Sequence, residues 1–452
     1  MKRTTMTTTS RRLIAAVLCT ALLAACTESD RPTASGKGTI RGVHAIADAP
    51  DVMFLIEERS LGTLAFRATT PAQPFDDLTY NFNFDVRLPG SGSVERLVTE
   101  TLTVVPQTDY VFALTGSLDA PSLVLWETPE RSWQGNETVL EVSAGHLAAG
   151  SGPLDVYFAP PGTAPAAGQP RGTLNFGDKL EPFEVESGDW VLTLTPAGDP
   201  SDVLFRSGAQ DLSARSSLLY TIQDADPSLT SRIAVQRVSR EGTVSNLPDP
   251  RFRPTRRFFH AAQGTATADV AIDGDLANPI VTGLEYGTVS TDVTVPSGTS
   301  EFAFTQAGNP GAVLHEEEDT VPGNSRSTAF LVGEPGDLEM ISFADNRRPL
   351  ADFARLRMTL LSAGIERANL WLLDAGTDRA DASPNFPRLN TLSTTGYVTL
   401  VPGDYELWVT FGDDDTLAAG PVAVDLAAGD VVELAIVDTA DPNRLEVVIY
   451  DP

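Results

Sequence analysis

From residue 38 onward, short runs in which apolar and polar residues alternate are separated by clusters of glycine, proline and aspartate. In one such run, Trp190, Leu192 and Leu194 occupy every second position. A period of two is typical of a half-buried antiparallel strand, whereas an amphipathic helix repeats its apolar residues about every 3.6 positions. We find no convincing helical run in this part of the chain, so the pattern predicts an all-β protein.

A short phrase that ends a strand recurs along the chain and divides it into repeats. His44, His146 and His260 mark three copies of the phrase, and Ser362 takes the place of the histidine in a weaker fourth copy. The copies are 102, 114 and 102 residues apart. Each repeat has the length of one domain and offers about seven short strands, which indicates an immunoglobulin-like or related β-sandwich.

The repeats and the linkers between them predict the domain boundaries. We expect a signal peptide at 1–25, a flexible tether at 26–37, and four tandem immunoglobulin-like β-sandwich domains at 38–127, 138–240, 254–347 and 353–452. Residues 67–86 of the first repeat look like an insertion. The linkers are short, so we expect the domains to follow one another as a semi-rigid string of four beads.

The phrase that opens the repeats resembles the first motif of a known family. HAIADAPDV at 44–52 is similar to the histidine-containing string that opens the bacterial secreted family called domain of unknown function 4397, and PGDY at 402–405 resembles one of its later landmarks. By this resemblance the chain contains four tandem copies of the domain. The resemblance implies an envelope or extracellular β-sandwich. The family has no settled activity, so it transfers no catalytic residue and no cofactor.

The N-terminus resembles a bacterial lipoprotein signal. A basic segment at 1–12 precedes an apolar run at 13–25 that is too short to cross a bilayer comfortably. The run leads into LAAC at 23–26, which is similar to the lipobox in which the cysteine receives the lipid, so Cys26 is the expected site of lipid attachment. Thr27 follows the cysteine. By the same resemblance, an aspartate at this position would favour retention at the inner membrane, so the threonine favours the outer membrane of a Gram-negative cell envelope. We expect the lipid to anchor the protein to that membrane.

Charge and cysteine content exclude several classes of function. The formal net charge is −29, and the basic N-terminal segment makes the remainder more acidic still. Such a surface repels nucleic acid phosphates, so we expect no nucleic-acid partner. Cys19 and Cys26 are the only cysteines. The domains therefore have no disulfide, zinc-thiolate or thiol chemistry available to them.

The repeat histidines are the first candidates for chemistry. His44, His146 and His260 have the side chain of a metal ligand or a base, but equivalent positions of different domains lie too far apart to bind one ion together. We favour a histidine whose ring nitrogens satisfy backbone groups in the bend that follows the strand. His315 precedes EEED at 316–319, which we interpret as an acidic loop.

Acidic runs at 316–319 and 413–415 and a group of aspartates at 374–381 offer oxygen ligands for calcium. None has the spacing of a calcium-binding loop, so solvated turns are favoured. Four aromatic residues are expected in cores rather than on a sugar-stacking platform: Trp190, Phe302, Tyr405 and Trp408. We find no motif for nucleophilic catalysis or for phosphate or dinucleotide binding. We therefore predict no catalytic, cofactor-binding or metal-binding residue.

Together these features predict a lipid-anchored cell-envelope protein with a structural or binding role, whose partner is another envelope protein or a glycan. Two alternatives stay open. The first is a surface adhesin or glycan-binding protein, which requires exposed aromatic residues on one sandwich face. The second is an envelope enzyme with an unrecognised site, which we expect either at 67–86 or in the fourth repeat, because such a site should break the repeat symmetry.

Overall fold

The computed structural model describes residues 33–90, 92–166, 168–227, 229–412 and 415–450. Cys26, the signal peptide and most of the tether therefore lie outside the described residues. In the described ranges, every regular element except the short 3₁₀ helices η1 (Ala149–Ser151) and η2 (Arg379–Asp381) is a β-strand, so the predicted all-β class is confirmed. No helix in this part of the chain has the length and apolar character needed to cross a membrane.

The first two domains are two-sheet sandwiches. The first contains β1 (Lys37–His44), β2 (Val52–Ile56), β3 (Arg59–Leu64), β4 (Gln73–Asp76), β5 (Thr79–Arg87), β6 (Val94–Thr103), β7 (Thr108–Gly116) and β8 (Pro121–Pro129). Its sheets have the orders β4-β1-β7-β8 and β3-β2-β5-β6. The second contains β9 (Val139–Leu147), β10 (Leu154–Ala159), β11 (Gly172–Leu174), β12 (Phe183–Glu186), β13 (Gly188–Pro196), β14 (Phe205–Arg206), β15 (Gln210–Leu212), β16 (Ser217–Asp224), β17 (Ile233–Ser239) and β18 (Val244–Leu247). Its sheets are β12-β9-β16-β17-β18 and β11-β10-β13-β14, and β15 pairs with β13.

The third and fourth domains repeat this plan. The third contains β19 (Thr255–His260), β20 (Ala268–Ile272), β21 (Val281–Leu284), β22 (Val293–Thr294), β23 (Gly298–Gln306), β24 (Asn309–Val321), β25 (Arg326–Glu334) and β26 (Asp337–Ala344). The fourth contains β27 (Ala354–Leu360), β28 (Arg367–Asp374), β29 (Phe386–Asn390), β30 (Ser393–Leu400), β31 (Gly403–Phe411), β32 (Leu417–Leu426), β33 (Val431–Asp438) and β34 (Leu445–Ile449). The sheet orders are β22-β19-β25-β26 and β21-β20-β23-β24 in the third, and β30-β27-β33-β34 and β29-β28-β31-β32 in the fourth.

One connection is common to all four domains. The opening strand of each first sheet lies parallel to a late strand: β1 with β7, β9 with β16, β19 with β25, and β27 with β33. Parallel neighbours cannot be joined by a tight hairpin. The chain therefore leaves the first sheet after the opening strand, builds the second sheet and then returns. The bend that follows the opening strand accordingly has the same place in every domain, and the predicted set of four tandem immunoglobulin-like sandwiches is confirmed.

The prediction that residues 67–86 form an insertion is wrong. β4 pairs with β1, and β5 lies between β2 and β6. These are the places that β12 and β13 hold in the second domain. Phe82 and Phe84 of β5 point into the core, as Leu192 and Leu194 of β13 do. The first repeat has the same strands here as the second but different types of side chain. The equivalence of the two segments is therefore not apparent from their sequences.

Each sandwich has its own core between its two sheets. In the first domain, the ring centroids of Phe54 and Phe84 are 4.8 Å apart and those of Phe82 and Phe112 are 4.5 Å apart. Separate apolar clusters fill the other three sandwiches. Full burial of one large apolar side chain stabilises a fold by ~1.5–3 kcal/mol. Each domain thus has a hydrophobic core of its own.

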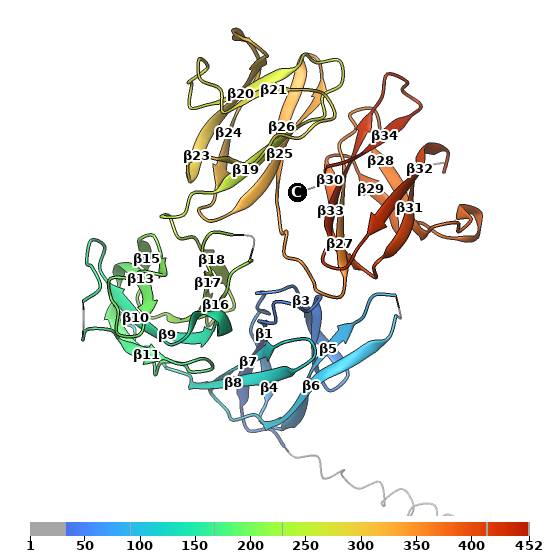
Figure 1. The fold of residues 1–452 in the computed structure, drawn as a ribbon. Helices are drawn as coiled ribbons and strands as arrows, with labels where there is room; N and C mark the ends of the chain where they lie inside the picture. The colour runs from blue at the N-terminus through green and yellow to red at the C-terminus, as the bar shows by residue number, and fades with distance from the viewer. Residues whose placement is uncertain (1–32, 91, 167, 228, 413–414, 451–452) are drawn as a thin grey trace, which may run out of the picture.

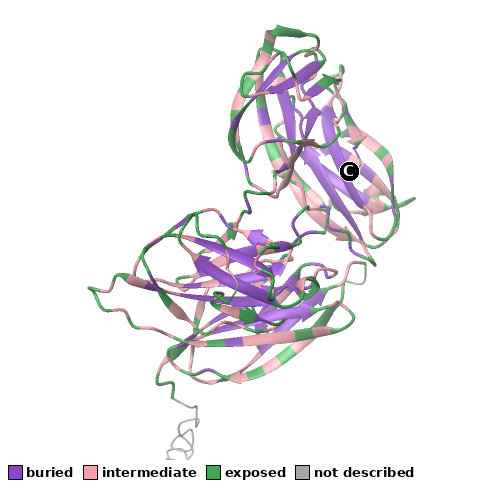
Figure 2. Ribbon diagram, turned by 60° about the vertical axis from the view of Figure 1, so that its left-hand side comes forward, coloured by how far each residue is buried: buried purple, intermediate pink, exposed green. Residues whose placement is uncertain are grey.

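The domains are arranged as two face-to-face pairs (Figure 1). One additional buried cluster lies between the first and second domains, and another lies between the third and fourth. In both pairs the contact is made by the outer faces of the first sheets, and Figure 2 shows buried residues running through the interior of each pair. The predicted string of four beads is therefore wrong. A string of separate domains would expose the outer faces of the sheets to solvent. These faces carry apolar residues, and burying those residues against a neighbouring domain is favourable.

Candidate functional site

Each repeat histidine is buried at the end of its opening strand and is bonded through both ring nitrogens. In His44, His146 and His260, Nδ1 accepts the backbone N–H of the second residue along, at 3.4, 3.1 and 3.3 Å. Nε2 lies 3.1, 2.9 and 3.1 Å from the carbonyl oxygen of the sixth residue along. A carbonyl can only accept, so the proton is on Nε2. This confirms that the ring nitrogens satisfy backbone groups in the following bend.

Burial keeps the three histidines neutral. It lowers the pKa of His44 to about 3, and the positive charge of Arg348 acts in the same direction. Burial also lowers the pKa of His146 and of His260. A proton added to Nδ1 would remove the bond from the backbone N–H. Because both nitrogens are engaged, these rings hold the bend in shape and are not free to act as bases or metal ligands.

An aromatic ring stands edge-on to each of these histidines. Phe66, Phe176 and Tyr286 have centroid distances of 6.2, 6.3 and 5.9 Å to the histidine ring, with interplanar angles of 79°, 77° and 82°. Sequence reasoning did not connect these residues with the histidines. The available signal was an aromatic residue two positions after a leucine in three repeats, at 64–66, 174–176 and 284–286.

The fourth domain has neither the histidine nor the ring. Ala45, directly after His44, donates its N–H to the parallel strand β7 at 2.8 Å, and Leu361 donates the equivalent bond to β33 at 2.8 Å. Leu360 is therefore the equivalent of His44, and the prediction that Ser362 replaces the histidine is wrong by two residues. The likeness of the small residues after Leu361 to those of the other copies concealed this shift.

Two buried aspartates that the sequence did not single out fix a turn of the second sheet. Asp155 accepts the N–H of Gly198 at 2.8 Å, and Asp269 accepts the N–H of Gly308 at 2.8 Å. Hydrogen bonds to an ionised carboxylate are among the stronger ones in proteins. The signal for them was an aspartate at the same place in LDV at 154–156 and ADV at 268–270. Their role is to hold the strand-to-strand turn.

The predicted acidic loop at 316–319 is instead part of β24, where it pairs with β23. Two of its side chains have partners. Glu317 accepts the N–H of Met340 at 3.0 Å and lies 3.0 Å from His315 Nε2. Asp319 accepts hydrogen bonds from Arg256 at 2.7 Å and from Ser342 at 2.9 Å. The run therefore lies in a paired strand, where two of its acids are bonded to neighbouring groups and the other two are exposed.

The other acidic groups form local turns. In the run 413–415, the first two residues lie outside the described part of the chain, and Asp415 accepts a hydrogen bond from Asn369 at 2.8 Å. In the group at 374–381, Asp378 caps η2 by accepting the N–H of Ala380 at 2.9 Å. Among the described residues, no three histidine, cysteine, aspartate or glutamate side chains are grouped to hold a metal ion.

Three of the four aromatic residues considered for a sugar platform belong to cores. Phe302 is fully buried, and Trp190 and Tyr405 pack against the cores of their domains. For Trp408 the core prediction is wrong, because its neighbours along β31 point into the core and it points to the opposite face, paired with Trp371 of β28. A guanidinium group, that of Arg379, lies 5.0 Å from the Trp371 ring centroid.

The interface between the first and second domains has an apolar cluster and also pairs Arg240 of the second domain with Asp109 and Glu130 of the first. The Trp126 side chain is 4 % exposed, and its indole N–H donates to the carbonyl oxygen of Gly177 at 2.8 Å. The ring lies directly on Gly145 of β9, and a Cβ at that position would overlap with it. Val111 and Leu147 complete the apolar contact. A glycine is needed here because only a bare backbone lets the indole come so close.

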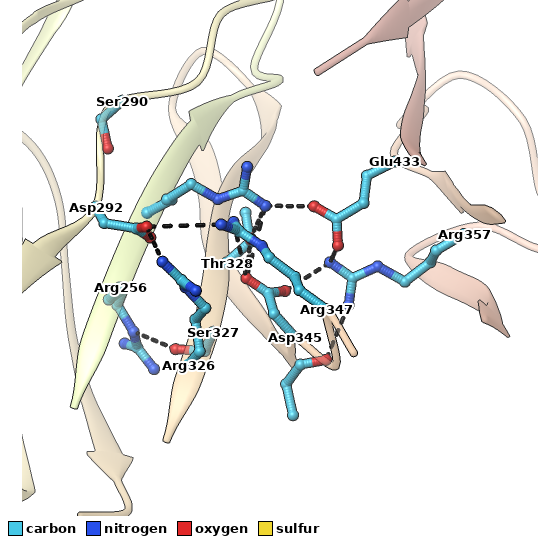
Figure 3. Close-up of polar contacts among 12 residues, drawn as sticks. Arg256, Ser290, Asp292, Arg326, Ser327, Thr328, Asp345, Arg347, Arg357 and Glu433 are labelled. Atoms are coloured by element: carbon cyan, nitrogen blue, oxygen red, sulfur yellow. Dashed lines mark hydrogen bonds and ion pairs between the residues drawn. The ribbon is translucent and has the colours of Figure 1, made fainter. Parts of the chain in front are cut away.

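The interface between the third and fourth domains encloses a network of charges (Figure 3). Arg257 of β19 bonds to Glu433 of β33 across the interface. Arg357 of β27 lies 2.6 Å from Glu433 and 2.6 Å from Asp345, which follows β26. The side chains of Glu433 and Asp345 are 0 % exposed. Tyr397 donates its hydroxyl to Glu433, so the carboxylate has three partners.

A pseudo-two-fold relation explains this network. Arg257 and Thr328 face each other in the strand register of the third domain, as Arg357 and Glu433 do in the fourth. Arg257 meets Glu433 across the interface, but the equivalent of Glu433 in the third domain is Thr328, so Arg357 has no second carboxylate at that position. Asp345 supplies the missing acid: it bonds to Arg357 and accepts the hydroxyl of Thr328 at 2.9 Å. Burial alone would lower the pKa of Arg357, but the surrounding acidic and phenolic groups, Glu433 foremost, raise it above its usual value.

The linker between the third and fourth domains joins the second pair to the first. Arg348 is 3 % exposed and donates to the carbonyl oxygens of Ala47 and Ala49, in the bend after His44. Its guanidinium group also lies 4.8 Å from the ring centroid of Phe66. In Figure 1 this linker passes beside β3 of the first domain. The opening phrase of the first repeat is therefore a contact point for the other half of the molecule.

Comparison with protein families agrees with the duplicated phrase. The family model for domain of unknown function 4397 matches residues 38–157 and 255–367, which together are more than half of the chain, and the chain belongs to this family. Each match begins at the opening strand of the first domain in a pair and ends inside the second domain of that pair. No curated protein matches the chain.

Three solved structures show remote likenesses to the chain. The Bacillus anthracis TIE protein is 11% identical, with 90% of this chain and 69% of that chain covered and a TM-score of 0.16. A streptococcal virulence factor described as binding α-glucan is 13% identical over 44% of this chain and 96% of that chain, with a TM-score of 0.17. The pneumococcal glycogen-degrading virulence factor SpuA is 10% identical over 63% and 38% of the two chains, with a TM-score of 0.13. At these TM-scores the likenesses carry no functional argument.

Proposed function

We propose that the protein is a lipid-anchored cell-envelope protein that serves as a rigid scaffold with a structural or binding role. The observation that carries the proposal is the packing of the domains. Every domain buries the outer face of its first sheet against a neighbour, and Arg348 ties the second pair to the first. Domains packed in this way keep their exposed loops at fixed positions relative to one another, which is what a scaffold requires.

The anchor is supported by LAAC at 23–26. It is tested by growing cells that express the full chain with radiolabelled palmitate. We expect label in the parent chain and none in Cys26→Ala, which should also leave the membrane fraction. Cys19→Ala removes the other cysteine and should keep its label. Label that persists in Cys26→Ala would overturn the anchor.

The scaffold is tested on the purified Cys26→Ala chain by small-angle X-ray scattering. We expect the distance distribution of one compact particle, because the domain pairs and the Arg348 contact hold all four domains together. An extended distribution with separate domain peaks would contradict a rigid scaffold.

A further inference from the structure

Two repeats carry a side chain at a backbone position that suits glycine. These residues are Arg67 in the first domain and Leu392 in the fourth, whose N–H donates to the carbonyl of Leu360 at 2.7 Å with φ +54°, and Arg67 is the charged one of the two. The N–H of Arg67 donates to the carbonyl of His44 at 2.7 Å, and Gly177 and Gly287 make the same bond to their own repeat histidines at 2.8 Å. All three have positive φ, +69° for Arg67, +87° for Gly177 and +75° for Gly287. Glycine takes this conformation freely, whereas a residue with a Cβ is strained in it. A side chain that persists at a strained position is a candidate for function.

The Arg67 side chain lines a cavity at the junction of the first three domains. The cavity has a volume of about 400 Å³, within the usual range for small-molecule sites. One part of its wall is apolar and includes Ile233, Leu247 and Pro322. Another part includes three asparagines, Asn246, Asn324 and Asn346. An apolar wall with a few polar groups is the common composition of a site for a small organic molecule.

Arg67 is the group of this cavity with donors to spare. Its half-buried guanidinium has no hydrogen-bond partner among the described residues, although the charge of Asp226 acts on it. The other acids of the wall are occupied: Asp249 is bonded to Arg251 and Asp345 to Arg357.

Arg67 also belongs to a group of three arginines, because its charge and that of Arg355 both act on Arg348. Arg348 and Arg355 donate to backbone carbonyl oxygens and are not part of the cavity wall, so Arg67 is the member of the group that lines the cavity. A planar guanidinium forms two parallel hydrogen bonds with a carboxylate, which makes it the usual residue for binding such a group.

We propose that this cavity binds an organic anion with an apolar body, and that Arg67 bonds to the anion's carboxylate. The apolar wall would bury the body of the ligand, and the asparagine amides would orient it. The site gives the scaffold a ligand, so the inference extends the binding role proposed above.

The test uses the purified full chain and a panel of small aryl and alkyl carboxylates, each paired with its neutral amide. Binding is measured by saturation-transfer NMR and titration. We expect at least one carboxylate to bind at least 10-fold more tightly than its amide, and Arg67→Gly to weaken that binding at least 10-fold. Arg67→Gly should fold and melt no lower than the parent chain, because glycine occupies this place in two other repeats.

Arg388→Gly is the matched control. Arg388 also has positive φ, +55°, but it is exposed on the fourth domain, away from the cavity. This variant should bind the carboxylate like the parent chain. No binding by any carboxylate of the panel, or equal binding by Arg67→Gly and the parent chain, would overturn the site. Either result would leave the lipid label at Cys26 unchanged, so failure of the site is distinguishable from failure of the anchor.

Discussion

The two domain pairs bury the same faces of the same sheets with different chemistry. Glu433 of the fourth domain is the strand-register equivalent of Val111 in the first and Leu219 in the second, because each lies opposite the same residue of its opening strand. The first pair packs Trp126 against a glycine and pairs Arg240 with Asp109 and Glu130, whereas the second combines its apolar cluster with a buried network of arginines around the carboxylates of Glu433 and Asp345.

The difference teaches that the backbone arrangement of a pair does not depend on one type of contact. Removing charges from water is costly, so a buried ion network adds less stability than apolar groups of the same volume would. The network has another consequence. If the third domain paired with the first, Arg257 would face Val111 where Glu433 now stands. The charges therefore select the correct partner among four similar domains.

Removing the central carboxylate should have the largest effect. Glu433→Ala leaves Arg257 and Arg357 buried with Asp345 as their remaining acid, and breaking a buried ion pair from one side costs roughly 3–5 kcal/mol. We expect the third and fourth domains to lose about that much stability, measured by urea unfolding and by hydrogen-exchange mass spectrometry of β19 and β33. The first pair should be unchanged.

Glu318→Ala is the control for the loss of one negative charge, since Glu318 is exposed on β24. It should change stability by less than about 0.5 kcal/mol. If Glu433→Ala behaved like this control, the charge network would not be what holds the second pair together.

A smaller effect is expected from adding one methyl group to the first interface. Gly145→Ala would place its Cβ within the ring of Trp126, so the indole must move away from Gly177. Overpacking of this kind costs typically 1–3 kcal/mol. We expect a loss of stability in that range, confined to the first pair, together with a change in tryptophan fluorescence.

Gly135→Ala is the matched substitution, because a Cβ at Gly135 meets no atom within 4 Å. It should leave the unfolding curve of the first pair in place. Equal stability of the two variants would mean that the Trp126 contact is not tight, and the contrast between the two ways of packing an interface would lose its basis.

How much of this could be predicted from the sequence depends on the range of the contacts. The histidine bend was predictable because both partners of the ring lie within six residues of it. The sandwich class was predictable because strand periodicity is local. The aromatic ring beside His44 was not connected with it, because Phe66 comes from a different strand connection.

The domain pairing required information that a pattern of single strands does not state directly. A signal was present in RFFH at 257–260, where Phe258 and Phe259 are successive and point to opposite faces of the sheet. Successive apolar residues in a strand indicate that both faces are buried. The charge network could not be inferred in this way, because Arg257 and Glu433 are 176 positions apart and only the folded pair brings them together.

The smallest effect compares the two pairs in acid. The first pair has two histidine bends and the second has one, since Leu360 replaces the fourth histidine. Burial lowers the pKa of His44 to about 3, and an unfolded histidine has a pKa of about 6.5. Below pH ~6.5 the histidine ring binds a proton in the unfolded chain but stays neutral in the folded one. The histidine therefore costs no stability above that pH. As the pH falls from there toward ~3, the free energy of unfolding decreases by up to ~1.4 kcal/mol per pH unit for each such histidine.

We expect the first pair to lose more protection than the second between pH ~7 and pH ~5, measured by hydrogen exchange corrected for the intrinsic rate at each pH. His44→Leu copies the arrangement of the fourth domain. It should lower stability at neutral pH, because the N–H of Ile46 and the carbonyl of Pro50 lose their partner, but it should also reduce the acid dependence of the first domain. An unchanged acid dependence in this variant would show that groups other than the histidine bend govern the response, and the two pairs would then differ only in how their interfaces are filled.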